Sequence, residues 1–353
     1  MKKLFQVICS IIILSSCAPD ISMTVDADNM VIFPPPPSTP RIQYLTSLNN
    51  SLDISGEQTG LKKFIFGEQE ALPILKPYGI VISDNKIYIC DTGIRGLEVL
   101  DLENNKFEYF IPQGKGALQF PVNATMDEKG RLFIADANRK QIVVFDNELK
   151  YIDAFGQPGD FKPTGIHYYD KRLWVASVSS HRVYVYDADS FDLLLSFPDA
   201  EKDAGHYLYQ PLNIFVNDSA VYITDFGEFK IKKYSHEGQF TGSIGAYGNN
   251  YGQFTRPKGL AADSENRLYV VDAAFENVQI FSTAGELLMA FGGSYPGKGA
   301  MSLPAGITVS QQCLDYFEKF VYKDFKLEHL ILVSNQFGSE KISVYGFISA
   351  KPN

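Results

Sequence analysis

Short apolar runs separated by turn-forming residues follow one another along most of the chain. From residue 77 onward one order of runs returns. A proline opens an apolar run, a turn follows, a second apolar run ends in an aspartate, and a third run is rich in β-branched and aromatic residues. The first copy reads Pro77-Tyr-Gly-Ile-Val-Ile, then Ile87-Tyr-Ile-Cys-Asp91, then Leu97-Glu-Val-Leu. Runs of this length and composition between turns predict strands, so the chain is expected to be all-β.

Six copies of this unit follow one another. Their opening prolines are 44, 42, 48, 46 and 47 residues apart, at Pro77, Pro121, Pro163, Pro211, Pro257 and Pro304. This period is typical of a four-stranded propeller blade. The sequence therefore predicts a six-bladed β-propeller over residues 41–353.

The sixth copy has no fourth strand-like run of its own, whereas the other five copies have one. The run Arg41-Ile-Gln-Tyr-Leu-Thr-Ser-Leu48 precedes the first copy, and we expect it to pair with the C-terminal blade and close the ring, because an open blade would leave strand edges unpaired. The sixth copy also carries an insertion, residues 311–325, whose apolar residues Cys313, Phe317, Phe320 and Val321 recur at helical spacing. A short helix is predicted there.

The order Pro-x-Gly-Ile, Leu-Tyr-Val-x-Asp and apolar third strand resembles the NHL repeat, and the resemblance covers about residues 41–353. Two copies depart from it, with Ser177 and Asn335 at the strand-end aspartate position. The lead Phe33-Pro-Pro-Pro-Pro37 with Pro40-Arg41-Ile42 resembles bacterial lipoproteins of this kind. The resemblance implies an NHL/TolB-like ring. NHL-like rings include a zinc-dependent lyase acting on hydroxyglycine peptides, and related six-bladed rings include calcium-dependent lactonases.

The N-terminal residues are typical of an export signal, with Lys2 and Lys3 before the apolar run 4–14. Leu14-Ser-Ser-Cys17 resembles the bacterial lipobox, which implies that Cys17 carries lipid. We therefore expect a lipoprotein signal peptide at 1–16, a lipidated cysteine with a Pro-rich tether at 17–40, and the propeller at 41–353. A bacterial envelope location follows, and Ala18 favours the outer membrane because it is not the aspartate associated with inner-membrane retention. The alternative is an ordinary secretory signal in which Cys17 is incidental.

Charge and cysteine usage limit the partners. Removal of residues 1–16 leaves 30 basic residues against 41 acidic ones, a net charge of −11 with histidine neutral. Such a surface repels phosphate backbones, so nucleic acid is not expected as a partner. Cys90 and Cys313 lie in the first and last blades, which are neighbours in a closed ring. Two separate buried thiols are expected, with a disulfide as the alternative.

Four strand-end acids invite a functional interpretation, because ring symmetry brings equivalent positions towards one axis. They are Asp91, Asp136, Asp225 and Asp272. We favour a structural role, in which a short acid accepts hydrogen bonds from turn amides. Arg95, Arg139, His181 and Lys230 follow at spacings that would allow them to pair with these acids across the turn.

No catalytic motif is recognisable. None of the five histidines, His167, His181, His206, His236 and His329, has metal-ligand spacing, so no metal site and no cofactor are predicted. His167 and His206 are the two that could approach the axial channel. A metal-dependent lyase or lactonase in that channel is the alternative function.

In propellers, the turns between second and third strands and the connections between blades lie on one face, which we call the loop face. Candidate binding residues there are Tyr78, Arg95, Arg139, His181, His206, Lys230, Tyr247, Tyr251 and Tyr295. Aromatic rings with a few polar groups suit a protein, peptide or glycan. The predicted function is therefore that of a lipid-anchored binding or scaffold module. Gly116, Gly252 and Gly299 each precede a blade proline by five residues, which predicts turns with positive φ.

Overall fold

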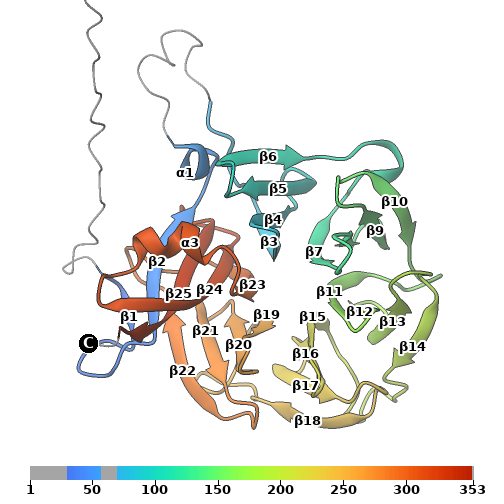
Figure 1. The fold of residues 1–353 in the computed structure, drawn as a ribbon. Helices are drawn as coiled ribbons and strands as arrows, with labels where there is room; N and C mark the ends of the chain where they lie inside the picture. Colours follow the sequence, from blue (N-terminus) through green and yellow to red (C-terminus); the bar gives the residue numbers. More distant parts are fainter. Residues whose placement is uncertain (1–29, 57–69, 352–353) are drawn as a thin grey trace, which may run out of the picture.

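The computed structural model describes residues 30–56 and 70–351. Six antiparallel sheets surround one axis (Figure 1), which confirms the predicted six-bladed β-propeller. Blade one comprises β3 (Pro77–Ser83), β4 (Lys86–Asp91), β5 (Gly96–Asp101) and β6 (Lys106–Phe110). Blade two comprises β7 (Pro121–Met126), β8 (Leu132–Asp136), β9 (Gln141–Phe145) and β10 (Tyr151–Phe155). Blade three comprises β11 (Pro163–Tyr169), β12 (Arg172–Ser177), β13 (Arg182–Asp187) and β14 (Leu193–Phe197).

The next two blades repeat the same order. Blade four comprises β15 (Pro211–Val216), β16 (Val221–Asp225), β17 (Lys230–Tyr234) and β18 (Phe240–Ile244). Blade five comprises β19 (Pro257–Ala262), β20 (Leu268–Asp272), β21 (Asn277–Phe281) and β22 (Leu287–Gly292). Each innermost strand starts at its blade proline, a position that tolerates the missing backbone donor. The second strands carry continuous apolar runs because neighbouring blades cover both of their faces.

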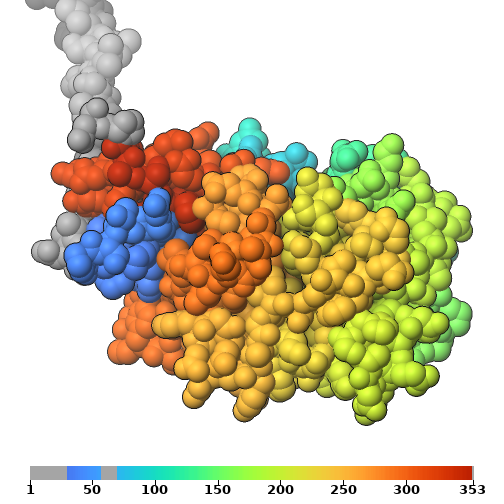
Figure 2. All heavy atoms as spheres, turned by 90° about the horizontal axis from the view of Figure 1, so that it is seen from below, coloured from blue at the N-terminus to red at the C-terminus, as the bar shows by residue number. Residues whose placement is uncertain are grey.

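Blade six is completed by the N-terminal part of the chain, as predicted. Its sheet has the order β1 (Ile32–Phe33), β2 (Ile42–Leu48), β25 (Ile342–Ala350), β24 (Phe325–Asn335), β23 (Pro304–Ser310). β2 pairs with β25 from Ile42 opposite Phe347 to Leu48 opposite Ile342. Figure 2 shows the N-terminal part of the described chain, in blue, against the orange and red C-terminal part.

The ordered blade begins earlier than the predicted boundary at residue 41. β1 pairs with β2, and the backbone amide of Tyr44 donates to the carbonyl of Val31 at 2.9 Å. The Phe33 ring lies 6.2 Å from that of Phe291 in blade five. The proline run 34–37 therefore lies in the turn between two strands rather than in a tether. The predicted signal peptide, Cys17 and the tether up to residue 29 lie outside the described residues.

The predicted helix in blade six is present but short. α3 (Leu314–Phe317) continues into the 3-10 turn η3 (Glu318–Phe320), and Phe317 is fully buried. α1 (Leu52–Ser55) and the 3-10 turn η2 (Gly114–Gly116) were not predicted. Gly252 and Gly299 have positive φ angles of 84° and 76°. In η2 it is Gly114 that has positive φ, at 63°, so the prediction was wrong for Gly116.

The core consists of apolar clusters between neighbouring blades. The largest fully buried side chains include Trp174, Tyr186 and Phe133, each from the middle of a blade. Cys90 and Cys313 are buried free thiols in different clusters, as expected. No helix among the described residues is long and apolar enough to cross a bilayer.

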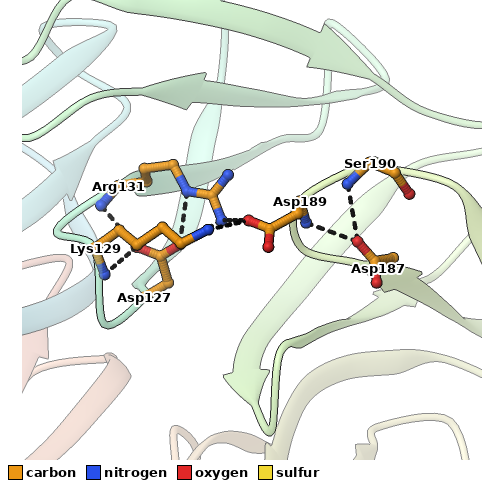
Figure 3. Close-up of polar contacts among 6 residues, drawn as sticks. All are labelled: Asp127, Lys129, Arg131, Asp187, Asp189 and Ser190. Carbon is orange, nitrogen blue, oxygen red and sulfur yellow. Dashed lines mark hydrogen bonds and ion pairs between the residues drawn. The ribbon is translucent and has the colours of Figure 1, made fainter.

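The face opposite the loop face, which we call the hairpin face, carries the turns between first and second strands and between third and fourth strands. Charged side chains join blades two and three there (Figure 3). The Arg131 guanidinium contacts Asp127 of its own turn at 2.6 Å and Asp189 of blade three at 2.8 Å. Lys129 also contacts Asp189, at 2.5 Å. The hydrogen bond and charge of Lys129 hold the pKa of Asp189 below its usual value.

Candidate functional site

The strand-end acids fasten the turns of the loop face. The carboxylate of Asp91 accepts hydrogen bonds from the backbone amides of Leu75 at 2.8 Å, Lys76 at 2.7 Å and Gly93 at 2.6 Å. Asp136, Asp225 and Asp272 likewise accept from the two residues before their own blade proline. All four carboxylates are fully buried. Each acid therefore ties a blade-to-blade connection to the turn between second and third strands.

The expected pairing of these acids with following basic side chains is not what the structure shows. The Arg139 guanidinium binds the side-chain oxygen of Gln141 at 2.6 Å and the carbonyl of Ala117 at 2.8 Å, and only the Arg139 backbone amide reaches Asp136. Lys230 pairs with Glu228 at 3.1 Å. The acids' oxygens are already used by backbone amides. The side chains of Arg139 and Lys230 therefore project away from them.

His181 and Arg95 also lie apart from the strand-end acids. Arg95 is exposed, and both residues adopt positive φ at the same turn position. The Nδ1 atom of His181 lies 2.7 Å from the carbonyl oxygen of Tyr209, and its ring lies 5.3 Å from that of Tyr207. Asp225 has an ion-pair partner among the described residues, but it is Lys232, at 3.3 Å.

The candidate tyrosines differ in their exposure. Tyr247 is 68% exposed and Tyr251 is 74% exposed, both in the connection from blade four to blade five. The Tyr247 ring packs against that of Phe229, with the ring centroids 4.8 Å apart. Tyr295 is 37% exposed, and its hydroxyl donates to the carbonyl of Gly299 at 2.7 Å. Tyr247 and Tyr251 are therefore available to a partner, whereas Tyr295 is partly used within its own loop.

A cavity of about 660 Å³ lies beside Tyr295 on the loop face. The connection from blade five to blade six forms one wall, and the turn containing Glu340 forms the other. Burial raises the pKa of the Glu340 carboxyl, and the Tyr44 hydroxyl and Lys298 partly offset this effect.

Glycines allow the innermost strands to approach one another closely around the axial channel. A Cβ atom on Gly306 would lie 2.1 Å from the carbonyl oxygen of Tyr78, and one on Gly79 would lie 2.7 Å from the Cα of Asn123. At the same level, the side-chain amide of Asn123 donates to that of Asn213 at 3.2 Å, joining blades two and four. Asn123 and Asn213 both line two cavities. One is about 250 Å³ at the loop face and the other about 340 Å³ towards the hairpin face.

The loop-face cavity of the channel receives one side chain from each blade, the residue after the blade proline. These residues are Tyr78, Val122, Thr164, Leu212, Lys258 and Ala305. Burial, and then the charges of Arg256 and Lys76, lower the pKa of Lys258 to about 8. No described carboxylate lies within ion-pair distance of Lys258. The cavity thus combines mainly apolar walls with one amine.

The cavity towards the hairpin face holds His167, whose ring lies 4.8 Å from that of Phe215. Burial lowers the pKa of His167 to about 4. His206 lies in the exposed connection before blade four and does not line either channel cavity. The two histidines are therefore not brought together. Over residues 30–56 and 70–351, no three His, Cys, Asp or Glu side chains are grouped so that they could hold a metal ion.

Among the candidate binding residues given above, Tyr78 lines the channel mouth, and sequence reasoning missed Lys258 in the same cavity. A signal was present in the aligned repeats. Lys258 occupies the position after the blade proline, where no other copy has a charged residue.

The comparisons with known proteins agree with the fold. No protein family matches the chain, and no curated protein matches it by sequence. Among solved structures, a structural genomics protein of unknown function from Bacteroides thetaiotaomicron is similar with a TM-score of 0.60 and 12% identity, covering 88% of this chain and 76% of its own. A streptogramin B lyase is similar with a TM-score of 0.54 and 15% identity, covering 78% and 84%. A chain of the nidogen/laminin complex has a TM-score of 0.53 and 18% identity, covering 68% and 88%.

These likenesses show a shared fold. At such low identity they carry no information about substrate or partner. The lyase and the nidogen/laminin complex illustrate that rings of this shape occur both in enzymes and in protein complexes.

Proposed function

We propose that this protein is a lipid-anchored, extracytoplasmic binding module of the NHL-repeat type, which presents its loop face to a protein, peptide or glycan. The observation that carries the proposal is the exposure of Tyr247 and Tyr251 on a loop face whose turns are fixed by buried acids. Large aromatic side chains on a rigid support contribute much binding energy at a small entropic cost.

The loop face also contains the two cavities described above, one beside Tyr295 and one at the channel mouth. A loop face that carries both exposed rings and concave, partly polar pockets suits a partner that buries an extended segment. A catalytic role would need reacting groups in one place. His167 and His206, the two histidines proposed for the channel, are not brought together.

The test replaces both exposed tyrosines with alanine in the full-length protein. Capture of a defined partner, identified by crosslinking on host envelopes and then purified, should weaken by about 2 kcal/mol or more. The melting temperature should stay nearly unchanged because the side chains are exposed. Leu194 and Leu288 are 53% and 51% exposed on outer strands, so Leu194→Ala with Leu288→Ala is the matched control. Equal capture by the two double variants would refute the proposal.

The lipid anchor is tested separately, with Cys17→Ser. Wild-type protein should incorporate radiolabelled palmitate and partition with membranes, and the variant should do neither. Incorporation that survives the substitution would show that Cys17 is not the acylated residue.

A further inference from the structure

The charged residues that flank the blade prolines, around the loop-face mouth of the channel, are all of one sign. The positions immediately before and after the six blade prolines contain four cations and no acid, although the chain has 41 acidic and 32 basic residues. We call these four the basic collar: Lys76, Lys162, Arg256 and Lys258. The first three are exposed at the rim, and Lys258 lies within the cavity. The collar is therefore a local positive patch on a protein whose net charge is negative.

Carboxylates close to the collar are already engaged with backbone amides. Asp91 binds the amide of Lys76, and Asp272 binds the amides of Thr255 and Arg256. Glu276 accepts a hydrogen bond from the amide of Leu303 at 2.9 Å. Within the described part of the chain, no collar residue forms an ion pair. The collar is thus able to receive an anion from outside.

The size and lining of the cavity limit the rest of the molecule that carries the anionic group. Its volume of about 250 Å³ is close to that of roughly eight water-sized groups at about 30 Å³ each. Tyr78, Val122, Leu212 and Ala305 supply apolar wall. Lys258 is the only cationic side chain among the lining residues, so the pocket suits a singly charged group better than a phosphate dianion, which usually binds several donors.

We infer that this cavity binds a small organic carboxylate, with the carboxylate against the Lys258 ammonium and a short apolar body against Tyr78 and Leu212. This inference rests on the proposed function, because it names the ligand class of the same loop face. Such a group is found at the C-terminus of a peptide that ends in an apolar residue, or as a free short-chain acid.

Binding of the carboxylate is coupled to the charge of Lys258. Tyr78 lines the same cavity from β3, and Lys76 and Arg256 lie near enough for their charges to act on Lys258. Lys162 lies on the connection before β11, and the positions after the blade prolines on β7, β11, β15 and β23 are uncharged. Because the pKa of Lys258 is about 8, the free protein loses the ammonium as the pH rises through 8. Affinity for an anion is then reduced in proportion to the remaining protonated fraction.

The experiment is a ligand-observed NMR titration of the full-length protein with hexanoate, hexanamide and inorganic phosphate. Hexanoate should bind at pH 7, and hexanamide at least tenfold more weakly because it lacks the charge. Raising the pH to 9.5 should weaken hexanoate binding at least tenfold. Lys258→Met should abolish both the binding and its pH dependence, and Lys258→Arg should retain binding without the pH dependence around 8. Lys106→Met removes a lysine from outer strand β6 and should bind as the wild type.

Three results would overturn the inference. Equal binding of hexanoate and hexanamide would show that binding does not depend on the negative charge of the ligand. Unchanged hexanoate binding by a folded Lys258→Met protein would place the site elsewhere. If phosphate displaced hexanoate at a concentration lower than that of hexanoate itself, the collar would be assigned to phosphate instead. The proposed function and this inference can fail separately, because alanine at Tyr247 and Tyr251 should leave hexanoate binding unchanged. If that variant also captured the partner as the wild type does, the proposed function would fail while the carboxylate site remained.

Discussion

At the residue scale, one buried carboxylate organises two segments of backbone. Asp136 accepts hydrogen bonds from the amides of Gln119, Phe120 and Arg139, at 2.6, 3.0 and 2.9 Å. The first two belong to the connection from blade one, and the third belongs to the turn after β8. The acid is therefore shared between two elements that strand pairing alone does not join.

Replacing Asp136 with alanine should destabilise the protein by about 3 kcal/mol or more. Three amide donors would lose their acceptor in a buried place, and each buried donor without a partner costs about 1–3 kcal/mol, with some relief from water entry. Chemical denaturation at pH 7 measures the effect. A loss below about 1 kcal/mol would mean that the amides find other acceptors.

Asp136→Asn is the informative comparison, because an amide keeps one acceptor oxygen. Blade six uses Asn335 at this position, where its oxygen accepts from Ser302 at 3.1 Å and its nitrogen donates to the Glu340 carbonyl and to Ser343. The asparagine variant should therefore lose less stability than the alanine variant.

The repeat pattern in the sequence was sufficient to predict that these acids bind turn amides, because position within a repeated turn determines it. It could not predict where Arg139 or Lys230 would point. A long side chain settles on whichever acceptor the three-dimensional fold supplies, here Gln141 and Ala117 for Arg139 and Glu228 for Lys230. The amine at the channel mouth is a further case, since its environment comes from six blades at once.

At the scale of elements, the N-terminal strand is fastened to the insertion in blade six by one side chain. Gln43 is buried, its side-chain nitrogen donates to the carbonyl of Phe320 at 2.8 Å, and its oxygen accepts from the amide of Tyr322 at 3.1 Å. Residues almost 280 positions apart are joined in this way.

Gln43→Leu should cost about 1–3 kcal/mol, because two buried backbone groups lose their partners while the side-chain volume is kept. Hydrogen exchange should show faster exchange at Tyr322 than in the wild type. Gln113→Leu changes an exposed glutamine in a blade-to-blade connection and should be nearly neutral. Equal exchange at Tyr322 in both variants would contradict the role given to Gln43.

Strand β2 was predictable because its apolar residues form a run of strand length and because the sixth copy has no outer strand of its own. Strand β1 was not, since Ile32 and Phe33 are only two residues followed by prolines, and such a segment has no periodicity. Its place depends on Phe291 and Tyr44, which lie far away in the sequence or across the turn.

At the scale of the whole molecule, two enclosed histidines make the stability depend on pH. Burial lowers the pKa of His167 to about 4 and also lowers that of His329, which is buried beside the Tyr269 hydroxyl, Asp263, Arg267 and Glu328. Asp127 lines the cavity of His167 but is paired with Arg131. Both histidines are thus neutral in the folded protein at pH 6.

Because the folded pKa lies below the unfolded one, the unfolded chain takes up protons first as the pH falls. The stabilisation is complete above about pH 6.5 and is lost between pH 6.5 and 4, by roughly 1–2 kcal/mol for His167 by pH 5. His167→Phe, measured by denaturation at pH 7 and 5, should show a smaller loss than the wild type. An identical loss would indicate that His167 is protonated in the folded state.

Ring closure is the property that all six blades share. Within residues 30–56 and 70–351, β2 pairs with the outer edge of β25 and β1 pairs in turn with β2. β2 also buries Ile42 and Leu48 in the neighbouring core clusters. Deleting residues 30–48 would expose that edge and empty the space that these side chains fill. Removing a single buried Ile or Leu side chain costs about 2–5 kcal/mol, so the deletion should cost more than 5 kcal/mol and broaden the unfolding transition.

A rearranged chain separates loss of the strand from loss of the N-terminal connection. Ile42 lies opposite Phe347, so β25 ends on the hairpin face where β2 begins. Attaching residues 41–48 after residue 351 through a short glycine-containing turn would build blade six as a continuous meander with the same register. Calorimetry should show that this protein regains a single sharp transition, whereas the deleted protein does not. If the deleted protein melts as sharply and at the same temperature as the wild type, the ring does not depend on its N-terminal strand.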